Sequence, residues 1–202
     1  MTTNTINTVA DYLRDTVDWN KFYSVVDTIG KSLNGAKDRF EKSDLFEGAL
    51  EAYSKNQEIK YVNENGVDHL LPKINTNLEM KFSSGGLYHV RKPKTEKKVI
   101  LKDKIGSIRL VNTNSDTVRT ALPDNYADFL VLVDVNGAAV ISKETLKKYL
   151  RFGQGHIEAQ NIPISEVAIV VGPDSKIKRK ELSNFNYKEA KKKFQLDFLS
   201  KF

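Results

Sequence analysis

Residues 74–82 form the stretch INTNLEMKF, in which apolar or β-branched side chains alternate with polar ones without interruption. A two-residue period of this kind is typical of a strand that buries one of its faces. The sequence Ser-Ser-Gly-Gly at 83–86 follows directly and predicts the end of the strand. Because alternate side chains of a strand share a face, Glu79 and Lys81 are predicted to lie side by side on the polar face.

Other segments predict further strands. Residues 129–133 (FLVLV) are all apolar, which predicts a central strand covered on both faces. Asn136-Gly137 follows and predicts a type I′ hairpin turn, because both residues tolerate a positive φ. The turn leads into a second apolar strand over 138–141. Shorter extended segments are predicted over 59–62, 67–71 and 167–171.

Helices are predicted near both ends of the chain and in two segments between them. Apolar positions recur at helical intervals over 8–33, which predicts one or two helices. A further helix is predicted to begin at Ser43 or Asp44 and to end near Asn56. The remaining helices are predicted from the cap at Ser142 to near Arg151, and over 186–199. This order of helices and strands predicts the α/β (α+β) class.

The composition favours one domain and excludes several kinds of site. A chain of 202 residues is predicted to form a single domain over 1–202. Its expected parts are an N-terminal helical part at 8–56, a sheet core at 57–171 and a C-terminal helix at 186–199. Because the chain has no cysteine, disulfide scaffolds, thiol nucleophiles and cysteine zinc sites are excluded. Three scattered histidines also argue against a histidine metal centre.

Charge and hydropathy bear on location and partners. No apolar run approaches the ~20 residues that span a bilayer, and the first residues lack a basic start followed by an apolar block. We therefore expect a cytoplasmic protein without a membrane partner. Lys and Arg number 32 against 26 acidic residues, a net charge of +6. This excess favours a polyanionic partner such as nucleic acid, although solubility alone explains it equally well.

Two carboxylates are predicted to face one point of the sheet. Asp68 precedes Glu79 by eleven residues, on what should be a neighbouring extended segment, so a hairpin-like return brings the two together. Paired carboxylates with waters and a phosphate oxygen suit Mg²⁺, which prefers oxygen donors. Lys81 beside them would orient an attacking water or stabilise developing negative charge. The pattern predicts phosphodiester hydrolysis.

The arrangement of Asp68, then Glu79-Met80-Lys81 on a strand, after a helix that carries Glu47, resembles the PD-(D/E)XK nuclease superfamily and most closely its type II restriction endonucleases. The resemblance covers residues 43–142. It implies a restriction-endonuclease-like central mixed β-sheet flanked by helices. It also implies catalytic roles for Asp68, Glu79 and Lys81, metal binding by Asp68 and Glu79, and an additional metal or water ligand at Glu47. Val67 stands where the name-giving motif has proline.

The tripeptide Glu79-Met80-Lys81 is not by itself evidence for a nuclease. An acidic residue, any residue and then Lys occurs five times in the chain, where about three are expected by chance. Glu79 differs from the others by the regular alternation around it and the upstream acid at hairpin distance. The nearest rival is Glu58-Ile59-Lys60, whose only nearby upstream acid, Glu51, is predicted to be helical.

Each candidate has a purely structural alternative. Glu79 and Lys81 would also be explained as an exposed ion pair, and Asp68 as a turn residue. Glu47 lies three residues after Asp44 and would be explained as the capping box of its helix. The lysine-rich stretches would be explained as solvated surface.

Two polar stretches are candidates for contact with DNA. One is strongly basic and closely follows the predicted catalytic strand, so its side chains suit the phosphate backbone. The other lies between core elements and carries Asn and Arg, the side chains that recognise adenine and guanine edges, although a plain turn also explains it. The candidates are Arg91, Lys92, Lys94, Lys97 and Lys98 in the first stretch, and Asn112, Asn114 and Arg119 in the second.

The resemblance implies a Mg²⁺-dependent endonuclease for double-stranded DNA, of the type II site-specific restriction kind, that leaves 5′-phosphates. Twofold-symmetric cutting implies a homodimer. Two alternatives remain open at this point: a basic protein that binds nucleic acid without chemistry, and a repair or junction-resolving nuclease of the same fold.

Overall fold

The structure is a computed structural model that describes residues 5–32, 39–64, 66–83, 86, 88–90, 100–112, 121–153, 155–180 and 182. Its helices are α1 (Ile6–Thr16), α2 (Trp19–Ser32), α3 (Arg39–Ala52) and α4 (Lys143–Lys148), with short 3-10 turns at Lys55–Gln57, Pro72–Ile74 and Ile164–Glu166. Its strands are β1 (Lys60–Glu64), β2 (Val67–Leu71), β3 (Thr76–Ser83), β4 (His89–Val90), β5 (Ile100–Leu101), β6 (Ile108–Asn112), β7 (Phe129–Asp134), β8 (Gly137–Ser142), β9 (Leu150–Gly153), β10 (His156–Ala159) and β11 (Ala168–Val171).

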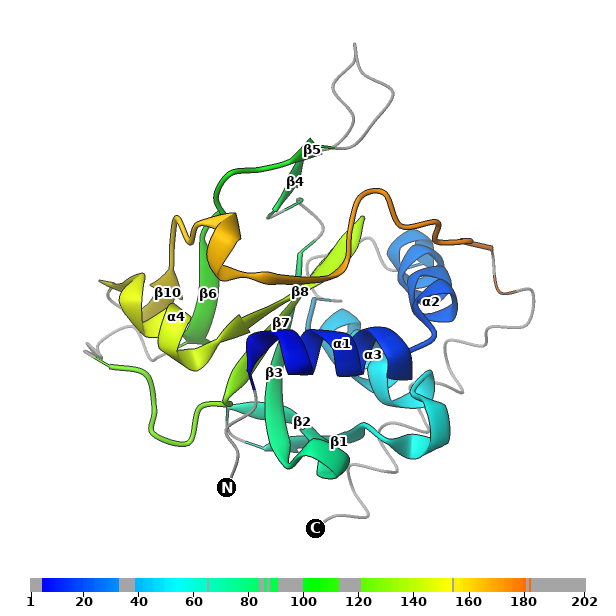
Figure 1. The fold of residues 1–202 in the computed structure, drawn as a ribbon, viewed down its shortest axis with the longest axis horizontal. Coiled ribbons are helices and arrows are strands. Elements are labelled where there is room, and N and C mark those ends of the chain that lie inside the picture. The colour runs from blue at the N-terminus through cyan, green and yellow to red at the C-terminus, as the bar shows by residue number, and fades with distance from the viewer. Residues whose placement is uncertain are drawn as a thin grey trace.

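A mixed sheet of six strands forms the centre of the fold, in the order β1-β2-β3-β7-β8-β11. Strands β3 and β7 run parallel, and every other neighbouring pair is antiparallel. A smaller antiparallel sheet, β6-β10-β9, lies to one side of it, and β4 pairs with β5 above it in the view of Figure 1. The α/β class and the mixed central sheet expected from the sequence are therefore confirmed.

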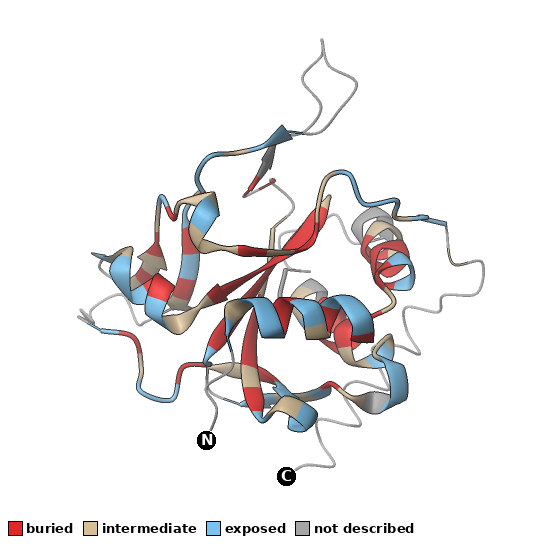
Figure 2. Ribbon diagram, in the orientation of Figure 1, coloured by how far each residue is buried: buried red, intermediate tan, exposed pale blue. Residues whose placement is uncertain are grey.

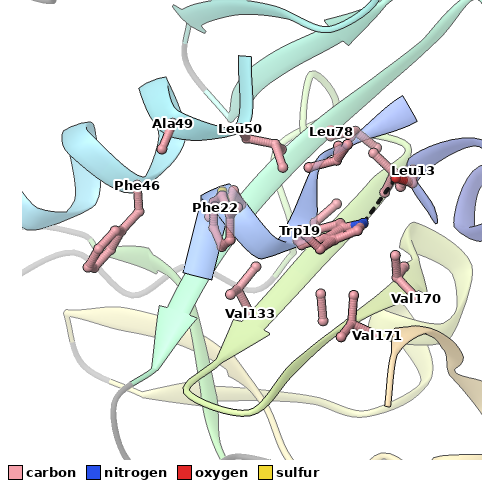
Figure 3. Packing of buried hydrophobic residues seen from close by; sticks show 14 of the residues in the cluster. Leu13, Trp19, Phe22, Phe46, Ala49, Leu50, Leu78, Val133, Val170 and Val171 are labelled. Atoms are coloured by element: carbon pink, nitrogen blue, oxygen red, sulfur yellow. Dashed lines mark hydrogen bonds between the residues drawn. The ribbon is translucent and has the colours of Figure 1, made fainter. Parts of the chain in front are cut away.

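Helices α1, α2 and α3 cover one face of the central sheet. Helix α1 packs against β8 and β11, whereas α3 packs against β1, β2 and β3. The core between the layers contains Phe22, Leu50 and Val133 (Figure 3). Trp19 fills this core as a packing residue, and its indole N–H donates to the Leu13 carbonyl at 3.1 Å. Burial of these side chains supplies the main force that holds the helical layer on the sheet.

The opposite face of the sheet is covered by the small sheet, α4 and the segment 121–128. Leu130, Leu132 and Ile141 point to this side, where they pack with Leu146 of α4 and Ile157 of β10. Strand β7 is consequently buried along its whole length, as the sequence predicted (Figure 2). Every residue that projects from either face of β7 or from the middle of β3 is therefore screened from solvent to a large extent.

Two element boundaries differ from the prediction. The strand predicted over 74–82 begins at Thr76 instead of Ile74. The reason is that Pro72–Ile74 forms a 3-10 turn, which ends on Asn75 with a φ of 47°. Helix α3 begins at Arg39, four residues before the predicted start, and ends at Ala52. Glu47 therefore lies in the middle of a helix, where the backbone N–H groups are already paired, and the capping-box explanation for it is wrong.

The β7–β8 hairpin exists, but its turn is not of type I′. The register pairs Asp134 with Gly137, which makes Val135-Asn136 the two-residue loop. Neither Asn136 nor Gly137 has a positive φ. The Asp134 carboxylate instead accepts from the backbone N–H groups of Asn136 at 2.8 Å and Gly137 at 3.1 Å, so a side chain stabilises this turn.

The other predicted elements are confirmed where the structure describes them. The predicted helical segment 8–33 contains α1 and α2 as far as Ser32, and Ser142 caps α4 by accepting from the Thr145 N–H at 3.1 Å. Strand β11 covers most of the predicted 167–171 segment. The predicted end of the helix near Arg151 is wrong: α4 ends at Lys148, and Arg151 belongs to β9, which begins at Leu150. The predicted helix at 186–199 falls outside the described residues.

The outer edge of the central sheet at β11 is tied to α1. Arg14 donates from Nη2 to the Ile169 carbonyl at 2.7 Å and from Nε to the Val170 carbonyl at 3.2 Å. The register between β8 and β11 shifts between Ile169 and Val171, so the edge carries an irregularity as well. No helix in the described part of the chain is long and apolar enough to cross a membrane.

Candidate active site

The register of β2 against β3 brings the two predicted acidic residues together. His69 and Leu78 form the last pair of this antiparallel ladder, Asp68 and Glu79 are the next residues along the two strands, and the Glu79 carboxylate is close enough to raise the pKa of Asp68. Residues that face each other in this way project to the same side of the sheet. Because Glu79 pairs with Leu130 of the parallel neighbour β7, this is the side covered by the small sheet.

The Asp68 carboxylate lies where the two strands separate. The ladder between β2 and β3 ends at the His69–Leu78 pair, and Asp68 Oδ2 accepts from the Met80 backbone N–H at 2.7 Å. The side chain thus replaces the backbone carbonyl that a continued ladder would supply. Asp68 is only 7% exposed and is the second residue of β2, so it lies in the strand and not in the turn before it.

Lys81 lies on the same face and forms an ion pair with Glu79. Glu79 is 6% exposed, so this is not the exposed pair of the structural alternative, and β3 is covered on both faces instead of one. Burial alone would lower the pKa of Lys81, but the carboxylates of Glu79, Asp68 and Glu47 together raise it above its usual value. Lys81 therefore stays protonated at neutral pH.

Glu47 lies on α3, which packs on the other face of the sheet, and its carboxylate acts electrostatically on Asp68 and Lys81. Its two carboxylate oxygens accept from the Ser43 hydroxyl at 2.8 Å and from the Tyr61 hydroxyl of β1 at 3.2 Å. Its backbone carbonyl accepts from the Nε2–H of His69 at 2.8 Å. These contacts fix the helix against β1 and β2 next to Asp68, and they leave the Glu47 side chain 7% exposed.

The cluster contains more acidic than basic groups. Burial is the largest of the causes that raise the pKa of Asp68 to about 8, and the carboxylates of Glu47 and Glu79 raise it more than the Met80 N–H and Lys81 lower it. Burial also raises the pKa of Glu47. Three acidic side chains thus share one ammonium group, and Asp68 holds a proton at neutral pH. A buried carboxylate without a counterion is costly, so full ionisation of the cluster would require a further cation.

The donor set fits Mg²⁺ in the form predicted, with two protein carboxylates. Among the residues that the structure describes, no group of three or more His, Asp or Glu side chains is arranged to hold a metal ion. Mg²⁺ usually keeps several waters and is held by one or two carboxylates, which Asp68 and Glu79 supply. Glu47, held by Ser43 and Tyr61, belongs to the surroundings of the pair.

The rival tripeptide, Glu58-Ile59-Lys60, lies outside this cluster. Glu58 Oε1 accepts from Lys73 Nζ at 2.6 Å, and this ion pair lowers the pKa of Glu58. The side chain also accepts from Thr16. A carboxylate with a lowered pKa and its own counterion is satisfied without a metal ion, which separates Glu58 from Glu79.

The predicted DNA contacts mostly fall outside the described residues. Arg91, Lys92, Lys94, Lys97, Lys98, Asn114 and Arg119 are not described, and Asn112 is described only as the last residue of β6. These assignments stay predictions.

Sequence reasoning missed three residues around the cluster: Ser43, Tyr61 and Tyr126. Ser43 precedes Glu47 by four residues, a spacing that places both on one face of a helix, so it was detectable once the helix was known to begin earlier. Tyr61 and Tyr126 are brought near the site by the tertiary fold, and no local sequence pattern predicts their position.

Comparisons of the chain with protein-family models, with curated proteins and with solved structures found no match. The function is therefore inferred from the residues and geometry of the site.

His69 should make the fold sensitive to acid. Burial lowers the pKa of this fully buried histidine to about 4, against about 6.5 when it is unfolded. A lowered pKa contributes stability that is present above pH 6.5 and lost as the pH falls toward 4. We expect wild type to lose about 3 kcal/mol more than His69→Gln between pH 7 and pH 4 in urea unfolding. Parallel stability curves for the two proteins would contradict the assignment.

Proposed function

We propose that the protein is a Mg²⁺-dependent endonuclease that hydrolyses phosphodiester bonds of double-stranded DNA, of the PD-(D/E)XK type and, within it, a site-specific restriction endonuclease. The observation that supports the proposal is the convergence of Asp68 and Glu79 on one face of the sheet, with the Lys81 ammonium alongside. Three of the four predicted catalytic residues come from two adjacent strands, and Glu47 joins them from α3.

The order of elements also supports a restriction-endonuclease-like fold. The helix that carries Glu47 precedes the antiparallel strands β1, β2 and β3, and β3 then continues in parallel with β7. This matches the mixed sheet that the resemblance implies. Asp68 and Glu79 lie at the point where β2 separates from β3, and there the Asp68 carboxylate accepts from the Met80 N–H in place of a backbone carbonyl.

The residues suit hydrolysis of a phosphodiester. A Mg²⁺ ion at the carboxylate pair would acidify an attacking water and neutralise charge on the reacting phosphate. Asp68 and Glu79 would hold that cation. Because its pKa is raised, Lys81 carries a proton at neutral pH. It is therefore suited to donate to a phosphate oxygen and stabilise the developing charge, and it is not the base that deprotonates water.

The excess of acidic groups explains why such a site would require a cation before DNA can approach. Without one, Asp68 would hold a proton at neutral pH, and ionised Glu47 and Glu79 would repel the phosphate backbone. A bound divalent cation together with Lys81 would balance the charge of all three carboxylates, and the net charge of +6 on the chain then assists binding. A homodimer would supply one such site to each DNA strand.

The test is incubation of the purified protein with plasmid and phage DNA in Mg²⁺, with and without EDTA. We expect discrete fragments in Mg²⁺ and none in EDTA. A smear or nicks confined to branched DNA would favour the repair nuclease. Retention of DNA without metal-dependent cleavage at any divalent cation would overturn the proposal and favour the binding protein.

A further inference from the structure

Tyr126 is a buried residue near Asp68 and Glu79, and its hydroxyl makes no hydrogen bond to the described residues. The side chain is 2% exposed, and within the described part of the chain its hydroxyl has no hydrogen-bond partner. Buried hydroxyl groups are normally paired, so an orphan of this kind calls for an explanation. Its position relative to Asp68 and Glu79 supplies one.

The segment that carries Tyr126 is fixed to both strands of the candidate site. Just beyond Tyr126, the Ala127 N–H donates to the Gly66 carbonyl at 2.9 Å, at the start of β2. One residue later, the Asp128 N–H donates to Asn77 Oδ1 of β3 at 2.7 Å. Gly66 also touches Tyr126 directly, since a Cβ added there would lie 3.3 Å from the Tyr126 Cα.

The ring lies on the same face of the sheet as the carboxylates. Tyr126 packs in the cluster that contains Leu130 and Leu132, and these two residues pair with Glu79 and Lys81 across the parallel ladder. Burial raises the pKa of Tyr126 well above 10, and Glu79 and Asp68 add to the effect. The hydroxyl is therefore a protonated donor within electrostatic range of both acidic residues.

We propose that the Tyr126 hydroxyl is a hydrogen-bond donor of the active site, which binds an oxygen atom that arrives with the cation or the substrate. The inference rests on the proposed function. The oxygen belongs either to a water on the bound cation or to a non-bridging position of the phosphate. In both cases Tyr126 donates to an atom absent from the free protein, which accounts for its unpaired hydroxyl.

Tyr126→Phe removes the hydroxyl and keeps the ring, and Tyr23→Phe is a matched control. Tyr23 is also fully buried, and within the described residues its hydroxyl has no hydrogen-bond partner. It lies on α2 in the core between the helices and the sheet, and the charged groups that act on it are Asp134, Arg179 and Asp27. We expect Tyr126→Phe to lower kcat for DNA cleavage about 10–100-fold, the effect of losing one hydrogen bond to a charged group, and Tyr23→Phe to leave it within about twofold. Thermal midpoints should stay equal to wild type or rise.

Two measurements without turnover separate the sources of the oxygen. Calorimetric titration of the DNA-free proteins with Mg²⁺ should show weaker binding by Tyr126→Phe if the hydroxyl binds a cation-bound water. Gel shift with DNA in Ca²⁺ should show weaker binding if it binds the phosphate. A weakening in either assay, absent in Tyr23→Phe, supports the inference even if wild type shows no cleavage. Unchanged Mg²⁺ binding, DNA binding and kcat in Tyr126→Phe would overturn it. Wild type that cleaves no DNA would overturn the proposed function instead.

Discussion

Glu79→Gln should lower the rate of Mg²⁺-dependent DNA cleavage by about 1,000-fold or more, since the amide cannot replace a carboxylate as a cation ligand. The substitution preserves shape, so the buried β3 should keep its packing. DNA retention in a Ca²⁺ gel shift should persist within a fewfold, because most of that affinity comes from contacts with the backbone phosphates. Lys81→Ala should have a similar effect on cleavage.

Glu58→Gln is the matched control. Glu58 begins the rival tripeptide of the same form, but it is satisfied by Lys73 outside the cluster. We expect this variant to cleave DNA at the wild-type rate, with little change in stability. Normal cleavage by Glu79→Gln, or an equal loss in both variants, would contradict the assignment of Glu79.

Asp68→Asn should abolish cleavage and at the same time stabilise the metal-free protein. The raised pKa of about 8 means that ionised Asp68 costs the fold free energy, whereas protonated Asp68 does not. By linkage, the stability that protonated Asp68 contributes to the fold is fully present below about pH 4 and is lost as the pH rises through 8. At pH 9 we expect Asp68→Asn to exceed wild type by about 3 kcal/mol in unfolding free energy, and at pH 4 to equal it.

The response to Mg²⁺ distinguishes this effect from a general gain in packing. A cation bound to the folded wild type should raise its melting temperature in proportion to the logarithm of its concentration, and Asp68→Asn should respond much less. Wild type that is more stable than Asp68→Asn at pH 9 without metal would show that the Asp68 bond to the Met80 N–H outweighs charge repulsion. It would contradict the charge argument for a cation site.

The long regular patterns of the sequence were sufficient to locate the centre of the fold. The alternation over 76–82 and the apolar run at 129–133 correspond to β3 and β7, whose parallel pairing organises the sheet. The short strands β6, β9 and β10 were missed. Segments such as Leu150–Gly153 and His156–Ala159 contain four residues each, too few for a period to emerge, and they become strands only by pairing with one another.

The candidate site was predictable to the extent that it depends on strand geometry. Asp68, Glu79 and Lys81 come together because side chains alternate along a strand and β2 returns beside β3. The burial of the site was not predictable, since it depends on how the small sheet and the segment 121–128 cover that face. Tyr126 is 47 residues from Glu79 and was missed for the same reason: only the tertiary fold joins them.

The Arg14 side chain at β11 limits how two molecules of this protein can associate. Edge strands with free carbonyls invite a strand from another copy, which would build one continuous intermolecular sheet. Here two successive carbonyls of β11 already accept from the Arg14 guanidinium. The irregular register of β11 also disrupts the regular edge that pairing with a strand of another copy requires. A twofold arrangement of the proposed nuclease is thus expected not to pair strands of two copies across the β11 edge.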